Sequence, residues 1–89
     1  MNAETRELLR KEILRLTGVI KPLAIAIPML LQHLRSSFAQ LAESDLLAEL
    51  DYLVDKGLIV EADKTVSPEN KRWRITAAGR DWLAQEGLE

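Results

Sequence analysis

The stretch ESDLLAELDYLVDKGLIVEADKTVSPENKRWRIT, residues 43–76, decides the fold of this chain. In its first part, apolar residues recur at the three- and four-residue spacing that places side chains on one face of a helix. Gly57 follows, and glycine readily adopts the left-handed backbone that ends many helices. We therefore predict a helix that ends just before Gly57. Its buried face should comprise Leu46, Leu50, Leu53 and Val54.

A β-hairpin is predicted directly after this helix. Residues 58–62 have the composition of a strand, residues 67–70 form a turn with proline at its second position, and residues 72–76 form the return strand. Because side chains alternate between the two faces of a strand, Trp73 and Ile75 should be buried while Arg72 and Arg74 face outward.

The elements on either side of this stretch follow from capping residues and apolar spacing. Thr76 should cap a last helix over residues 77–85, and Ser44 is a better cap than Ala42 for the helix before Gly57. At the other end, Asn2 should cap a first helix that Gly18 ends. Residues 23–27 form either a short strand or a buried approach to a second helix, in which Pro28 occupies the first turn. The predicted core residues of these helices are Leu8, Leu9, Ile13, Leu16, Leu30, Leu31, Leu34, Trp82 and Leu83.

Length and composition limit the protein class. The chain has 89 residues, no cysteine and a net charge of −2. This length suits a single domain over residues 1–89, and the absence of cysteine rules out disulfides and thiolate metal sites. No signal peptide or stretch long enough to cross a membrane is visible, so we expect a cytoplasmic protein without membrane contact.

Two segments resemble the winged helix-turn-helix superfamily. Residues 50–59, LDYLVDKGLI, resemble the end of the third helix and the next strand in regulators of the MarR, PadR and ArsR kinds. Residues 73–79, WRITAAG, resemble the segment that ends the wing and begins the last helix. Residues 48–53, AELDYL, together with residues 56–59, KGLI, are also similar to segments of small winged-helix proteins of Mu-like prophages. The resemblance implies a mainly helical α+β fold with a three-helix core, a β-hairpin wing and a C-terminal helix.

The resemblance also implies where DNA would bind. In the superfamily the third helix lies in the major groove and the wing contacts the backbone or the minor groove. Carried over, the wing supplies Lys64, Lys71, Arg72 and Arg74, and the third helix presents Asp45, Ala48, Glu49, Tyr52 and Asp55.

The third helix departs from the pattern of a DNA reader. The helix carries four carboxylates but only one cation, Lys56. The carboxylates are those of Asp45, Glu49, Asp51 and Asp55. Lysine and arginine supply most non-specific affinity for DNA, and arginine, lysine, asparagine and glutamine most often read bases. The basic wing, with help from Arg35 or Arg80, is therefore the better candidate for phosphate contacts. The simpler alternative is a solvated strand edge that resists aggregation.

Two functions remain open at this point. The first is a small prokaryotic or phage transcriptional regulator that binds double-stranded DNA through Lys64, Lys71, Arg72 and Arg74. The second is a protein-interaction module without DNA binding. Its partner would contact the acidic face formed by Asp45, Glu49, Tyr52 and Asp55, with Tyr52 as an anchor because aromatic residues are common at interface centres.

An enzyme is not expected from this sequence. It has no phosphate-binding glycine-rich loop, no metal-ligand spacing and no serine in a nucleophile motif, and we expect no cofactor. The only histidine, His33, lacks candidate partners for catalysis or metal binding and reads as a surface residue. The first and last helices leave a homodimer possible as an alternative to a monomer.

Overall fold

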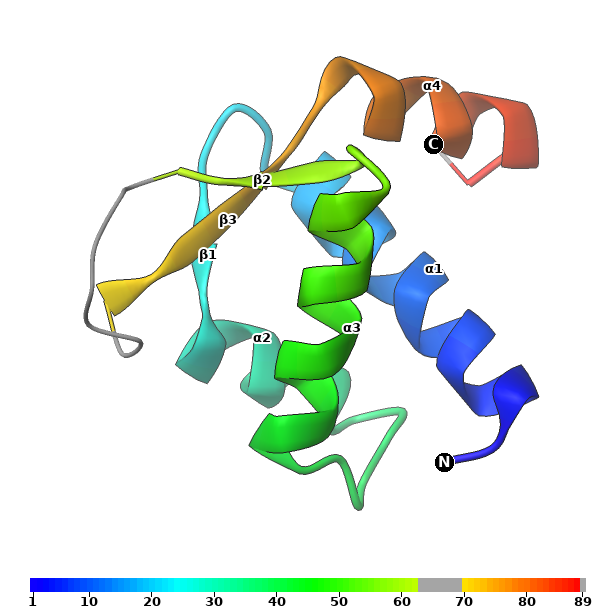
Figure 1. Cartoon of the computed structure of the whole chain (residues 1–89), viewed down its shortest axis with the longest axis vertical. Helices are drawn as coiled ribbons and strands as arrows, with labels where there is room; N and C mark the ends of the chain where they lie inside the picture. The colour runs from blue at the N-terminus through cyan, green and yellow to red at the C-terminus, as the bar shows by residue number, and fades with distance from the viewer. Residues whose placement is uncertain (63–69, 89) are drawn as a thin grey trace.

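The computed structural model describes residues 1–62 and 70–88. Within these residues the chain forms four helices and one three-stranded antiparallel sheet, which confirms the predicted mainly helical α+β class. Figure 1 shows the sheet at one side of the helices, with the last helix near the end of the central strand. The elements are α1 (Ala3–Val19), β1 (Ile25–Ala26), α2 (Ile27–Leu34), α3 (Glu43–Asp55), β2 (Ile59–Glu61), β3 (Arg72–Ile75) and α4 (Ala77–Glu86).

Helix α1 begins as predicted but presents a different face to the core. The Asn2 side chain accepts a hydrogen bond from the Thr5 backbone N–H at 2.8 Å. Leu8, predicted to be buried, is 58% exposed, whereas Leu14 is buried. The true buried face follows one helical stripe through Leu9, Ile13 and Thr17, and Leu8 lies about 100° away from Leu9 around the helix.

Gly18 lies inside α1 rather than ending it, so the predicted C-terminal cap is wrong. A Cβ at this position would lie 2.7 Å from Cδ1 of Leu83 on α4. The glycine therefore permits close packing of two helices. The helix continues to Val19, and Ile20 is its C-cap.

The segment after α1 contains the short strand that was one of the two predicted alternatives. In β1, Ile25 pairs with Trp73 and Ala26 pairs with Arg72 of β3. Helix α2 starts at once, with Pro28 in its first turn as predicted. Leu30 and Leu34 are fully buried, and Leu31 is half-buried.

Helix α3 has the predicted end, but its cap is the less favoured of the two predicted candidates. Its N-cap is Ala42, which makes no side-chain hydrogen bond, and Ser44 lies within the first turn. The carboxylates of Glu43 and Asp45 in this turn favour the positive end of the helix dipole. At the other end, Gly57 has φ +77°, and the N–H groups of Gly57 and Leu58 donate to the carbonyls of Val54 and Leu53. This paired arrangement satisfies the last carbonyls of the helix.

The central strand β3 lies between β1 and β2. Trp73 and Ile75 are buried and Arg72 and Arg74 are exposed, as the alternation predicted. The predicted turn at residues 67–70 lies almost wholly outside the described residues. The hydroxyl of Thr76 donates to the Gly57 carbonyl at 2.6 Å and accepts from the Gly79 N–H at 3.1 Å. Thr76 therefore caps α4, as predicted, and also ties its start to the end of α3.

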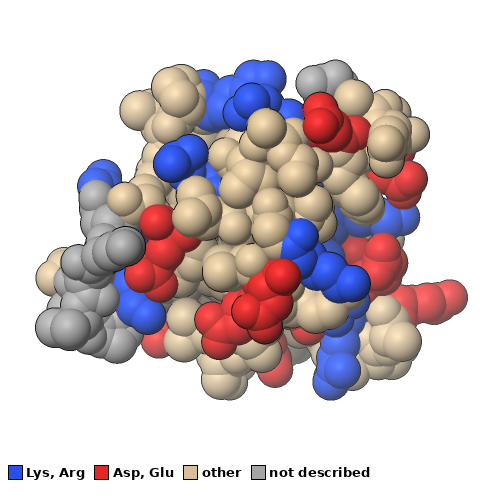
Figure 2. Space-filling model, turned by 45° about the horizontal axis from the view of Figure 1, so that its top comes forward, with Lys and Arg blue, Asp and Glu red and all other residues tan. Residues whose placement is uncertain are grey.

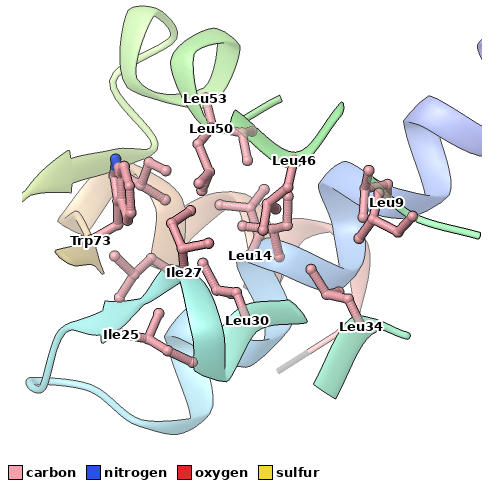
Figure 3. Packing of buried hydrophobic residues seen from close by; sticks show 14 of the residues in the cluster. Leu9, Leu14, Ile25, Ile27, Leu30, Leu34, Leu46, Leu50, Leu53 and Trp73 are labelled. Carbon is pink, nitrogen blue, oxygen red and sulfur yellow. The ribbon is translucent and has the colours of Figure 1, made fainter. Parts of the chain in front are cut away.

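The buried apolar side chains form one cluster to which every helix and strand contributes. Figure 3 shows Trp73 of the sheet, Ile27 and Leu30 of α2 and Leu50 of α3 around the same interior, with Leu14 of α1 close by. No helix among residues 1–62 and 70–88 is long and apolar enough to cross a membrane.

Candidate nucleic-acid interface

The outward face of the sheet carries the two predicted arginines of the return strand. Arg72 pairs across the strands with Ala26, and Arg74 pairs with Val60. Both of these cross-strand neighbours are uncharged residues. The sequence alternation correctly placed these side chains on the open face of the sheet.

The other two predicted wing cations differ from this pair. Lys64 lies outside the described residues. Lys71 is half-buried, and its Nζ lies 3.3 Å from Oε1 of Glu61 on β2. A partly exposed ion pair of this kind contributes little to stability, but it offsets much of the lysine's charge. Arg74, which forms no ion pair within residues 1–62 and 70–88, is therefore a stronger candidate than Lys71 for contact with an anion.

Arg74 also belongs to a hollow of about 360 Å³ that the sequence did not reveal. Lys21 comes from the turn between α1 and β1, and Arg80 comes from the first turns of α4. Pro22 and Ile75 complete the lining. No carboxylate lines this hollow among the described residues. Figure 2 shows lysine and arginine side chains grouped along the top of the view, with an acidic side chain to their right.

A second, smaller hollow of about 190 Å³ adjoins the first, because Lys21 and Arg80 line both. Arg15 also lines it, but the guanidinium group of Arg15 is paired with the carboxylate of Glu12 on the same helix. That pairing raises the pKa of Arg15, first through the hydrogen bond and then through the charge of Glu12. Lys21, Arg74 and Arg80 have no such partner within residues 1–62 and 70–88, and we name these three residues the basic hollow.

The acidic face of α3 is smaller than the sequence predicted. Asp45, Tyr52 and Asp55 are exposed as expected, but Glu49 is only 6% exposed. Its Oε2 accepts a hydrogen bond from Nε of Arg10 on α1 at 2.5 Å. The prediction that Glu49 faces outward is therefore wrong. Glu49 follows Leu46 by three residues, so it lies at the edge of the buried stripe, where Arg10 provides the compensating charge.

Arg10 connects this buried carboxylate to Tyr52. The Cζ atom of Arg10 lies 3.8 Å from the centroid of the Tyr52 ring, and Nζ of Lys56 lies 5.7 Å from it. Both distances fall within the range of cation–π attraction. The hydrogen bond to Glu49 raises the pKa of Arg10, burial opposes this effect, and the charge of Glu49 adds to the rise. Tyr52 is thus partly engaged within the protein.

A hollow of about 340 Å³ lies beside Tyr52, between α1, α3 and α4. Leu14, Leu53, Leu58 and Trp82 give it an apolar wall, and Glu7, Arg10 and Lys56 supply charges of both signs. This hollow suits an apolar group better than an ion, because apolar and aromatic side chains make up most of its lining.

The described residues contain no group of three or more histidine, cysteine or carboxylate side chains that could hold a metal ion. His33 is exposed in the last turn of α2. Comparison of the chain with protein-family models and with curated proteins yields no match.

Proposed function

We propose that this chain is a winged helix-turn-helix protein that binds double-stranded DNA, as a small transcriptional regulator of the prokaryotic or phage kind. The order of helices and strands in Figure 1 supports the fold proposal, because it is the order that the resemblance implies. The observation that carries the functional proposal is the position of Arg72 and Arg74. Both side chains are exposed on the same face of β3, opposite the buried Trp73 and Ile75.

Binding of a random-sequence duplex tests this function. Fluorescence anisotropy at about 50 and 200 mM salt measures how many phosphates the protein neutralises. A tenfold fall in affinity across this fourfold change corresponds to about two phosphates. We expect at least that fall. No binding at the lower salt concentration would overturn the proposal.

The double variant Arg72→Ala/Arg74→Ala should bind the duplex about tenfold more weakly than the wild type, and its salt slope should fall by about two. The matched control is Arg6→Ala/Lys11→Ala, which removes the same charge from the first half of α1. If both double variants lose affinity equally, net charge rather than the sheet surface governs binding.

A protein-interaction module is the second candidate, and the hollow beside Tyr52 favours it. Trp82 and Tyr52 both line this hollow, and Asp45 and Asp55 remain exposed on α3, the helix that carries Tyr52. The surface proposed for this role now excludes Glu49.

Asp45→Lys/Asp55→Lys should abolish capture of a partner in a pull-down from the source cells. The charge-matched control is Asp81→Lys/Glu86→Lys on α4, which should leave capture intact. Equal capture by wild type and both variants would rule out the acidic face of α3 as the binding surface.

A further inference from the structure

Three cations from distant parts of the sequence meet in the basic hollow. Lys21 follows α1, Arg74 is in β3 and Arg80 is in α4, and all three side chains are exposed around one concavity of about 360 Å³. Like charges repel one another, so their convergence has an electrostatic cost unless a counter-ion is shared among them.

Two carboxylates, one on α1 and one on β2, are paired with cations outside the basic hollow. Glu12 pairs with Arg15, and Glu61 pairs with Lys71. Asp81 follows Arg80 in sequence but does not line the hollow. The exposed carboxylates of α3 do not line it either. The basic hollow thus retains its positive charge among the described residues, and a concave surface lined by one sign of charge concentrates ions of the opposite sign.

We propose that the basic hollow binds a phosphate group of the duplex backbone, an inference that rests on the proposed DNA-binding function. Arg74 and Arg80 supply guanidinium groups, whose planar donors suit phosphate oxygens, and Lys21 adds a third charge. Pro22, which is exposed, provides apolar surface for the adjoining sugar.

This placement accounts for the unfavourable charges on α3. The duplex lies along the open face of the sheet, from Arg72 past Arg74 to the start of α4. The carboxylates of Asp45, Asp51 and Asp55 then make no phosphate contact, because none of them belongs to this surface. The hollow also extends the site beyond the hairpin to Lys21 and Arg80.

Lys21→Ala/Arg80→Ala tests the inference without altering either arginine that carries the proposed function. This variant should bind the random duplex about tenfold more weakly and with a salt slope lower by about two, whereas Arg6→Ala/Lys11→Ala should bind nearly as the wild type does. Lys21→Arg/Arg80→Lys should restore most of the affinity. Circular dichroism melting checks that each variant is folded; Arg6, Lys21 and Arg80 are exposed and Lys11 is half-buried.

The outcomes separate the inference from the function. If Arg72→Ala/Arg74→Ala weakens binding but Lys21→Ala/Arg80→Ala behaves as its control, the basic hollow is not a phosphate site and the function stands. If the wild type binds no duplex, the proposal of a DNA phosphate is overturned together with the function. Inorganic phosphate, followed by NMR at the amides of Lys21, Arg74 and Arg80, then decides whether the hollow binds free phosphate. If the chemical shifts of these amides do not change, the hollow binds neither a phosphate of the duplex nor free phosphate.

Discussion

Glu49→Lys is expected to lower the free energy of unfolding by more than about 3 kcal/mol, a large part of the stability of a small domain. The Glu49 side chain is 8% exposed, and its carboxylate contacts the guanidinium group of Arg10. A lysine there would place an uncompensated cation in a buried position next to another cation. Urea denaturation followed by circular dichroism measures the loss.

Smaller changes at Glu49 should have graded effects. Glu49→Gln removes the charge but keeps an acceptor, and it should cost about 1.5–3 kcal/mol, the usual contribution of a hydrogen bond to a charged group. Arg10 limits the loss, because its side chain is 24% exposed and can recover hydration. Asp51→Lys makes the same charge change as Glu49→Lys at an exposed position of α3. It should therefore shift stability by only about 0.5 kcal/mol.

The double variant Arg10→Met/Glu49→Met separates the need for a charge from the need for a filled volume. Replacing both members of a buried ion pair with apolar residues is often neutral or stabilising, so we expect stability near that of the wild type. A double variant as unstable as Glu49→Lys would show that the pair contributes through its geometry, including the contact of Arg10 with Tyr52.

Features that depend on neighbouring residues were predictable from the sequence. Asn2 and Thr76 cap their helices, and Gly57 ends α3, because each requires only a particular side chain or backbone next to a helix end. The outward direction of Arg72 and Arg74 followed from strand alternation. These local rules also gave the fold class, since apolar spacing and turn residues separated helices from strands.

Features that depend on packing between distant segments were not predictable. Glu49 lies at the edge of an apolar stripe, where a carboxylate ordinarily faces water, and its burial depends on Arg10, which lies 39 residues away. Leu14 is buried and Leu8 is exposed because of the way α1 lies against the rest of the core. Arg80 was named as a possible helper of the wing, but nothing in the sequence linked Lys21 to Arg74. Only the fold brings the turn before β1 and the start of α4 together.

Gly79→Ala should destabilise the protein, although alanine favours a helix more than glycine does. A Cβ at residue 79 would lie 2.2 Å from the backbone oxygen of Leu58 and 2.6 Å from Cγ1 of Ile75. A backbone carbonyl cannot move aside as a flexible side chain can. We expect overpacking to lower the free energy of unfolding by about 3 kcal/mol and the better helix propensity of alanine to raise it by about 1 kcal/mol. The net loss of stability is then about 2 kcal/mol.

The midpoint temperature of thermal unfolding should therefore be about 8–16 °C lower in Gly79→Ala than in the wild type. Each kcal/mol of lost stability lowers the midpoint by about 4–8 °C in a domain of this size. Gly18→Ala provides a comparison, because its nearest contact is the flexible end of Leu83, and it should lose less. Ala84→Ser adds an atom at an exposed position of α4 and should change the midpoint little. A midpoint raised by Gly79→Ala would mean that helix propensity outweighs the contact with Leu58, and that α4 does not pack this closely against the exit of α3.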